Sequence, residues 1–314
     1  MYGKLLDKIR EYDKITVFRH QKPDGDAVFS ALGLSTFLKE NFPDKKIMLC
    51  GTELYSKVNK IQKVSDRFVE DSLAIVVDTS TAARVDDDRF RKAKYVIKID
   101  HHPVNDNFGD LNFVKHETAA CCEYLAEIFL SDEFKEYKMS KKVCEYLYSG
   151  MVTDSLNFRT ASTTAQTLRI ASILAEKGEL QISDIVEFLM DDTIEEYQKI
   201  TKMRTYLKIK ERFGHITLNE KELDEIGFDP FEAKNHISEI GTILDLKIWI
   251  FAVKVGTKYD VSIRSKRGYV INRICEKYGG GGHANAAGIK QITLKQLNEL
   301  KKELIELSTK NPKK

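Results

Sequence analysis

Short apolar runs rich in β-branched residues alternate with helical patterns through the first half of the chain. Parallel strands cannot be joined by a tight turn and need a crossover, usually a helix, so this alternation predicts a parallel sheet covered by helices. The expected strands cover residues 15–19, 46–50, 73–77 and 95–99. The expected helices cover residues 28–40, 118–130, 141–151 and 163–177. The first half is therefore expected to be an α/β domain with a parallel sheet.

The length of the chain and a change of pattern near Asp191 predict two domains. A chain of 314 residues exceeds what one core usually supports, at about 150 residues per domain. A charged helical stretch follows Asp191. Beyond it, strands are expected at 207–219, 246–255 and 259–264, and helices at 270–278 and 294–307. We expect domains at 1–188 and 206–314, joined by a helical linker at 189–205, the second being a smaller mixed-sheet α/β domain.

Charge and hydropathy exclude several classes of protein. Lysine and arginine total 50 against 48 acidic residues, so the chain lacks the broad basic field that long DNA requires. The longest apolar run, 248–253, is far shorter than the roughly 20 residues of a membrane helix, and residues 1–14 do not resemble a signal peptide. The five cysteines form no C-x-x-C pair, which fits reduced, buried thiols. We expect a cytoplasmic protein with no membrane contact.

Ionisable side chains follow three of the expected strands at their carboxyl ends, where open α/β sheets bind ligands. His20 follows the first strand, Asp78 the third and Asp100 the fourth. The polar segments expected at this edge are His20 to Asp26, Asp78-Thr79-Ser80, Asp100-His101-His102-Pro103 and Thr153-Asp154-Ser155. Carboxylates and imidazoles dominate these segments.

Four aspartates in these segments would repel one another if they met at one edge. They are Asp24, Asp26, Asp78 and Asp154. At about 4 Å, each pair repels by roughly 4 kcal/mol at an effective dielectric constant near 20. Such a cluster needs protons or cations, and the imidazoles of His20 and His101 make divalent metal ions the simpler solution. Two ions sharing a bridging carboxylate could acidify a common water and direct it at phosphorus.

Each of these residues alone also has an ordinary structural explanation. An aspartate after a strand is commonly a turn residue or a helix N-cap, and Asp-Gly commonly forms a turn. Adjacent histidines in a loop are often exposed by chance. The combination of carboxylates and imidazoles at one sheet edge is what favours a metal site.

The four segments resemble the motifs of the DHH phosphoesterase family, named for the motif that stands here as Asp100-His101-His102. The family's His-x-x-Pro-Asp-x-Asp motif corresponds to His20 to Asp26. Its lone second-motif aspartate corresponds to Asp78, and its fourth-motif aspartate to Asp154. The resemblance covers essentially the whole chain and implies metal-dependent phosphoester hydrolysis.

The resemblance also implies a role for each matching residue. The first metal ion would be held by His20, Asp24 and Asp78. The second would be held by Asp26, Asp78, His101 and Asp154. Asp78 would bridge the two, and family members commonly use manganese, which suits a mixed carboxylate and imidazole shell. The implied catalytic residues are Asp78, His101, His102 and Asp100, where Asp100 orients His101 or His102, and His102 contacts the substrate phosphate.

A run of four glycines, Gly279 to Gly282, follows the expected helix at 270–278 and precedes His283. One glycine suffices for a helix C-cap, so the excess favours a loop whose backbone approaches a ligand closely. Residues 262–266 end an expected strand with two cations and two hydroxyls, which suits phosphate but equally fits a solvated surface.

This second half resembles the DHH-associated domain, in which a Gly-Gly-Gly-His loop and a strand-end Arg-Ser hold the nucleotide. The matching positions, implied to bind substrate, are Arg264, Ser265, Gly281, Gly282 and His283. The same domain occurs in alanyl-tRNA synthetases and RecJ-type exonucleases, so this loop alone does not establish hydrolysis. The resemblance makes 1–188 the metal-binding catalytic domain and 206–314 the substrate-binding domain, with the active site in the cleft between them.

Within the family, the chain resembles the stand-alone nanoRNase and pAp phosphatase group. The resemblance implies hydrolysis of short oligoribonucleotides to mononucleotides and of adenosine 3′,5′-bisphosphate (pAp) to AMP, without binding of long DNA. A soluble phosphodiesterase for linear or cyclic dinucleotides, such as pApA or cyclic di-AMP, is an alternative. A non-catalytic nucleotide sensor is another, although a sensor should lack a metal ligand and none is missing. The oligomeric state stays open, with a homodimer as one option.

Overall fold

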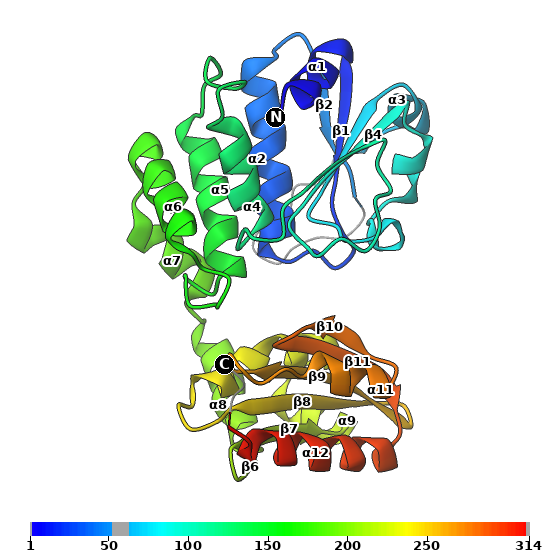
Figure 1. Cartoon of the computed structure of the whole chain (residues 1–314), viewed down its shortest axis with the longest axis vertical. Coiled ribbons are helices and arrows are strands. Elements are labelled where there is room, and N and C mark those ends of the chain that lie inside the picture. Colours follow the sequence, from blue (N-terminus) through cyan, green and yellow to red (C-terminus); the bar gives the residue numbers. More distant parts are fainter. Residues whose placement is uncertain (1, 52–62, 312–314) are drawn as a thin grey trace. The chain divides into compact units, whose positions relative to one another are not determined.

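The computed structural model describes residues 2–51 and 63–311 and divides into two compact units, Met1–Asp191 and Asp192–Lys314 (Figure 1). Each unit has an α/β architecture and its own hydrophobic core. The first contains an all-parallel sheet and the second a mixed sheet. The predicted fold class is therefore confirmed.

The first unit contains a five-stranded parallel sheet in the order β2-β1-β3-β4-β5. The strands are β1 Lys14–Phe18, β2 Lys46–Leu49, β3 Leu73–Val77, β4 Tyr95–Asp100 and β5 Leu111–Val114. The three inner strands, β1, β3 and β4, are almost entirely buried, which explains their continuous apolar sequences. Their carboxyl ends are neighbours, so the residues that follow them are brought to one edge of the sheet.

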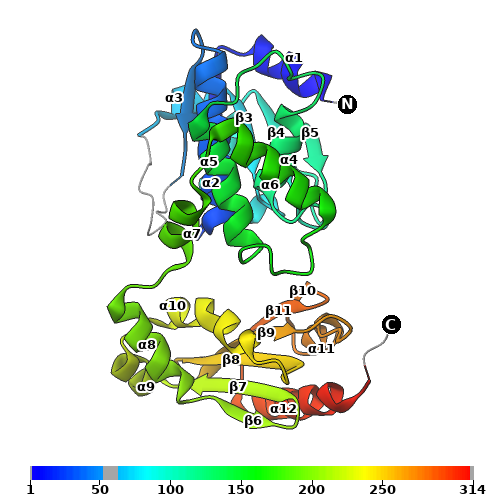
Figure 2. The same cartoon turned by 90° about the vertical axis from the view of Figure 1, so that its left-hand side faces the viewer.

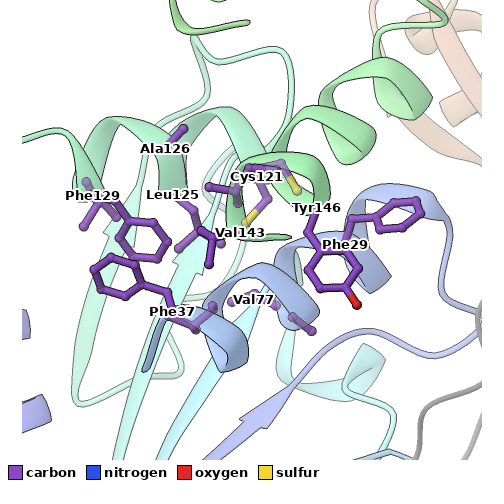
Figure 3. Close-up of a cluster of buried hydrophobic side chains, with 14 of the residues drawn as sticks. Phe29, Phe37, Val77, Cys121, Leu125, Ala126, Phe129, Val143 and Tyr146 are labelled. Carbon is purple, nitrogen blue, oxygen red and sulfur yellow. The ribbon is translucent and has the colours of Figure 1, made fainter. Parts of the chain in front are cut away.

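Helices cover both faces of this sheet. The longer elements are α1 Gly3–Glu11, α2 Gly25–Asn41, α4 Cys121–Phe129, α5 Lys141–Asp154, α6 Ala165–Gly178 and α7 Ile182–Met190. The short ones are α3 Asp66–Glu70, η1 Ala82–Arg84 and η2 Asp88–Lys92. On one face, side chains of α2, α4 and α5 gather over the sheet (Figure 3). The rings of Phe37 and Phe129 stack there at 3.8 Å, and truncating either to alanine should cost about 3–5 kcal/mol.

The second unit contains a six-stranded mixed sheet in the order β10-β11-β9-β8-β7-β6 (Figure 2). Only the β7–β8 pair is parallel among the described strands of this sheet. The strands are β6 Lys208–Lys210, β7 Phe213–Leu218, β8 Ile248–Val255, β9 Lys258–Ser265, β10 Gly281–His283 and β11 Ala286–Ile292. The helices are α8 Ile194–Arg204, α9 Glu220–Ile226, α10 Pro230–Asn235, η3 His236–Thr242, α11 Asn272–Lys277 and α12 Leu294–Thr309.

The two faces of this sheet carry separate cores. Leu297, Leu300 and Leu304 of α12 pack on one face. On the other, Trp249 and Phe251 of β8 pack under α8, α9, α10 and η3. Because successive side chains of a strand point to opposite faces, neighbouring residues of one strand belong to different cores.

Two predicted segments of the second unit were wrong in detail. The single strand expected at 207–219 is a hairpin of β6 and β7, because Glu211 turns the chain with a left-handed φ of +54°. The expected glycine loop is also a hairpin, in which β10 pairs antiparallel with β11.

Two simpler expectations concern the whole chain. The five cysteines are free and buried, so the prediction of unpaired, buried thiols is confirmed. Within residues 2–51 and 63–311, no helix has both the length and the apolar character needed to cross a membrane.

Candidate metal centre and substrate face

The predicted metal residues of the first unit lie at the carboxyl edge of its sheet. Asp78 directly follows β3, and Asp100 ends β4. His20 lies just past β1, where it forms an isolated bridge with Val85. Asp24 and Asp26 stand at the start of α2, and Asp154 is the last residue of α5. The structure therefore brings all six predicted metal residues, His101 included, to one site.

Asp78 lies at the centre of this site. Its Oδ2 is 3.5 Å from Nε2 of His20, and its Oδ1 is 3.4 Å from Nε2 of His101. The residue adopts a left-handed φ of +49°, a conformation that aspartate tolerates better than most residues, while its N–H donates to the Ile99 carbonyl. This backbone turn points one buried carboxylate at two imidazoles.

The first group of candidate ligands contains His20, Asp24 and Asp78. His20 Nδ1 contacts the Gln21 carbonyl at 2.8 Å, which leaves Nε2 facing Asp24 Oδ2 at 3.7 Å. The other oxygen of Asp24 accepts from the N–H of Ala27 and caps α2. Asp24 therefore has the ordinary N-cap role and also offers an oxygen to the site.

The second group contains Asp26, His101 and Asp154. His101 Nε2 lies 3.7 Å from Asp154 Oδ2 and 3.9 Å from Asp26 Oδ2. Its Nδ1 contacts the Thr118 carbonyl at 3.3 Å, which fixes the orientation of the ring. Because Asp78 touches His101 as well as His20, one carboxylate links the two groups.

Asp26 is held by a helix end that the sequence did not predict as part of the site. The N–H groups of Cys121 and Cys122, at the start of α4, donate to its two oxygens at 2.6 and 3.0 Å. Exposed N–H groups and the helix dipole both favour a carboxylate there. The sequence predicted a helix from residue 118, but no sequence pattern indicated that the start of this helix contacts Asp26.

Asp100 contacts His102 rather than His101. Its Oδ1 accepts from His102 Nδ1 at 2.8 Å and from the His102 N–H at 3.2 Å. His102 Nδ1 also lies 3.6 Å from Asp78 Oδ1, and Asp78, His101 and His102 form a third group of potential ligands. The sequence left open whether Asp100 orients His101 or His102. In the structure Asp100 contacts His102, whereas His101 contacts the Thr118 carbonyl.

The charges in this site are strongly coupled. Burial disfavours the charged form of His20, but its contacts with Asp24 and Asp78 outweigh burial and raise its pKa to about 11. Burial opposes ionisation of Asp78 as well, yet His101 and His20 hold its pKa well below the usual range. Burial and the neighbouring Asp78 raise the pKa of Asp26 to about 7, and burial raises that of Asp154. In the absence of a cation, protons on these imidazole and carboxyl groups therefore compensate the negative charge of the site.

These residues fit divalent cations. Buried Asp78 Oδ1 accepts no hydrogen bond from the described residues, although its carboxylate is almost fully enclosed. Within each group the potential ligand atoms lie within 4.8 Å of one another. Mixed imidazole and carboxylate donors are typical of manganese and related ions.

The register of the second sheet places three of the five predicted substrate residues, Arg264, Gly281 and His283, on one face, whereas Gly282 and Ser265 belong to the other. Arg264 and His283 are both paired with Ala286, and directly paired residues of antiparallel strands share a face. The next row contains Ser262, Gly288 and Gly281. Two potential phosphate contacts therefore border a row of residues with small side chains.

A cavity of about 370 Å³ lies over this row. Its lining comes from α10, the two strands β9 and β11, and the glycine segment. The lining residues are Lys234, Asp260, Val261, Ser262, Gly279, Gly280, Gly281, Gly288, Ile289 and Lys290. The cavity lining is thus rich in glycine and includes two lysines, of which Lys234 pairs with Asp260.

Ser265 has a different position from Arg264. It is buried on the opposite face, where its hydroxyl donates to the Tyr269 carbonyl at 2.6 Å and accepts from Asn285 Nδ2 at 2.8 Å. Its hydroxyl therefore stabilises the turn between β10 and β11.

Three of the four consecutive glycines are required by the fold itself. Gly279 has a φ of +75° after α11, where it and Gly280 donate to the Glu276 and Cys275 carbonyls in a Schellman cap. A methyl group on Gly280 would lie 2.4 Å from the Gly288 carbonyl oxygen. Gly282 has a φ of +139°, and a methyl group there would lie 2.4 Å from the Ala286 carbonyl oxygen. Gly281 has neither constraint, with no atom within 4 Å of an added methyl group.

A parallel-sheet unit with a His/Asp cluster that could bind metal ions, followed by a mixed-sheet unit with a glycine-rich face, is the arrangement of a two-domain enzyme with a candidate metal centre. Residues 14–151 match the model of the DHH family, N-terminal domain, and residues 217–310 match that of the DHHA1 domain. A probable bifunctional oligoribonuclease and PAP phosphatase NrnA of Streptococcus mutans is 33% identical over 98% of each chain. The NrnA protein of Bacillus subtilis, with the same two activities in its name, is 31% identical over 92% of each. The chain therefore belongs to the DHH family and is a hydrolytic enzyme.

Other similar proteins are more distant. An exopolyphosphatase-related protein from Bacteroides fragilis superposes with a TM-score of 0.84, covering 96% of this chain and 94% of that one, at 22% identity. This likeness supports the fold. A cyclic-di-AMP phosphodiesterase, GdpP, of Geobacillus thermodenitrificans is 24% identical over 96% of this chain and 48% of its own length.

Proposed function

We propose that this enzyme hydrolyses short oligoribonucleotides to mononucleotides and pAp to AMP, with two manganese ions as cofactors. The observation that carries the proposal is the position of Asp78, whose two oxygens face His20 and His101. The names of the two NrnA relatives, at 33% and 31% identity, support the choice of substrates. Residues 1–188 would form the catalytic domain and 206–314 the substrate-binding domain.

In this proposal, one ion would be held by His20, Asp24 and Asp78, and the other by Asp26, Asp78, His101 and Asp154. When bound, the ions supply positive charge for the phosphate and activate water for attack on phosphorus. The protein's contribution is to fix the ligands: the α4 N–H groups hold Asp26, and the Gln21 and Thr118 carbonyls orient His20 and His101.

His102 is proposed to contact a phosphate oxygen of the substrate. The Asp100 carboxylate accepts only, so the His102 Nδ1 that lies 2.8 Å from it carries the proton. This hydrogen bond fixes both the tautomer and the orientation of the ring. Asp100 is therefore a positioning residue, and His102 is the group that meets the substrate.

The second unit is proposed to hold the nucleotide through Arg264, His283, Gly281 and Gly282. Burial lowers the pKa of Arg264, and among the described residues no carboxylate lies within ion-pair distance of its guanidinium. A half-buried cation without an acidic partner suits a phosphate. Gly281 would let a ligand approach the backbone, while Ser265 contributes by supporting the hairpin turn.

Hydrolysis of dinucleotides is the second candidate function. The similarity to a cyclic-di-AMP phosphodiesterase favours it, and pApA presents the same kind of phosphodiester as short RNA. One purified sample should be assayed with pAp, pApA, RNA of five nucleotides, a 24-mer and cyclic di-AMP. The proposal expects turnover of pAp and the short RNA, with the 24-mer much slower at equal ends. Turnover confined to cyclic di-AMP and pApA would replace it with the second candidate.

A further inference from the structure

Lys98 is buried in the middle of β4, where a lysine is unusual. Its exposed fraction is 0%, and it stands two residues before Asp100 on the same face of the strand. Lysine is rarely enclosed in this way unless its charge is compensated. No other lysine among the described residues is buried. The position therefore requires a physical explanation.

Nζ of Lys98 makes two hydrogen bonds and one ion pair. Nζ donates to the carbonyls of Ser80 and Asp106, both at 2.9 Å, and lies 3.2 Å from Asp100 Oδ2. It also lies 5.2 Å from the centre of the Phe108 ring. Two carbonyl oxygens therefore accept hydrogen bonds from the ammonium, and the Asp100 carboxylate compensates its charge.

These oxygens belong to the segments that form the metal centre. Ser80 follows Asp78 by two residues, and Asp106 belongs to the loop that begins with His101 and His102. The Asp106 carboxylate binds back to the N–H of Ala82, which closes the connection between the two loops. Lys98 therefore joins the loop after β3 to the loop after β4 beneath the site.

The second oxygen of Asp100 explains why the charge is needed. Oδ1 accepts from His102, whereas buried Oδ2 accepts no hydrogen bond of ordinary geometry among the described residues. The ammonium of Lys98 is the cation beside that oxygen. Without it, a fully buried carboxylate would be left with the imidazole as its remaining compensation, and the ring would be drawn from its position.

We infer that Lys98 is a positioning residue for hydrolysis, acting through Asp100 to orient His102. The inference rests on the proposed role of His102 at the substrate phosphate. Lys98 touches none of the proposed metal ligands, so its removal should change turnover without changing metal content. Partners behind a functional histidine typically contribute about 10- to 100-fold to activity.

The test compares Lys98→Met, Asp100→Asn and the double variant with wild type, using pApA at saturating Mn²⁺. Lys98→Met keeps the volume and removes the charge. We expect kcat to fall by about 10- to 100-fold with bound metal unchanged. In the Asp100→Asn background, Lys98→Met should change kcat by less than about threefold, because its effect is transmitted through Asp100. Lys98→Gln, which keeps hydrogen-bond donors without the charge, should also lose activity.

Lys14→Met is the control, since Lys14 stands at the amino end of β1 and pairs with Asp71, just before the amino end of β3, whereas the metal residues follow the carboxyl ends of these strands. Its kcat should equal that of wild type. If Lys98→Met is too unstable to purify, the inference is tested by comparing kcat of the double variant, Lys98→Met with Asp100→Asn, with kcat of Asp100→Asn. A further loss there, or a folded Lys98→Met with wild-type kcat, overturns the inference.

His102→Ala distinguishes this inference from the proposed function. If His102→Ala keeps full turnover, the proposed role of His102 is wrong. If it loses turnover while Lys98→Met does not, only the role of Lys98 is wrong.

Discussion

Nε2 of His101 lies 3.4 Å from Oδ1 of Asp78, a buried oxygen that accepts no hydrogen bond from the described residues. Burying a carboxylate oxygen without a compensating partner costs free energy of folding. Neighbouring imidazoles compensate its charge only while they carry protons. A divalent cation would compensate it at any pH at which it binds. This relationship makes cation binding the simplest explanation of the site and gives it a measurable pH dependence.

Metal binding should become tighter as the pH rises. Without metal, Asp24 and Asp78 raise the pKa of His20 to about 11 after opposing burial, and burial raises that of Asp26 to about 7. A metal needs the neutral imidazole and the carboxylate, so binding releases protons, and each proton released changes the affinity about tenfold per pH unit. Calorimetry with Mn²⁺ at pH 6.5 and 8 should give tighter binding at pH 8. Equal affinity, with no proton release, would contradict the assigned ligands.

The two roles of Asp24 can be separated by two substitutions. Asp24→Ser keeps an N-cap oxygen for Ala27 but removes the carboxylate, so stability should change little while Mn²⁺ binding weakens. Asp24→Ala should weaken Mn²⁺ binding equally and also lose about 1 kcal/mol of stability with the cap. Thermal unfolding of the metal-free protein and Mn²⁺ titration measure the two effects. Unchanged Mn²⁺ affinity in both variants would leave Asp24 as an N-cap alone.

Gly281 and Gly282 should respond differently to alanine. Gly282→Ala places a methyl group 2.4 Å from the Ala286 carbonyl in a left-handed backbone and should lower the melting temperature by several degrees. Gly281→Ala meets no atom within 4 Å and should fold normally, but it should raise KM for pAp by about tenfold or more if a ligand approaches the backbone there. A Gly281→Ala protein with unchanged KM would remove this residue from the substrate face.

Arg264→Ala and His283→Ala should weaken substrate binding and leave the content of bound metal unchanged. A charged contact contributes about 1.5–3 kcal/mol, so kcat/KM for pApA should fall by about 10- to 150-fold. Bis-para-nitrophenyl phosphate has no nucleotide to hold, and its slow hydrolysis should change little. Loss of that control reaction in His283→Ala, with bound metal retained, would reassign His283 to the chemistry itself.

The strands that position the metal centre could be read from the sequence because their burial is continuous. β1, β3 and β4 are enclosed on both faces and therefore appear as apolar runs, and the residues that follow them meet at one edge. β5 was not predicted, since Leu111–Val114 is half-buried and its Asn112 interrupts the apolar pattern. The hairpin of β6 and β7 was missed because Glu211, not glycine, makes its left-handed turn.

Contacts between distant segments lay beyond any local pattern. Nothing near Asp26 indicates that the N–H groups of Cys121 and Cys122 will hold it. Ser265 and Arg264 are adjacent, yet alternation along β9 sends them to opposite faces, which the sequence motif treated as one contact surface. The four glycines form one motif in the sequence, but three of them are required by the backbone conformation and packing of the hairpin rather than by a ligand.

The most direct test is to count the metal ions bound by Asp78→Asn and to assay its hydrolysis of pApA. Asparagine tolerates the left-handed backbone of Asp78, so the fold should survive while the shared carboxylate is lost. Wild type should bind two Mn²⁺ per chain, and Asp78→Asn should lose both together, with turnover reduced by at least about 10³-fold. Two tightly bound ions and normal turnover in Asp78→Asn would contradict the account.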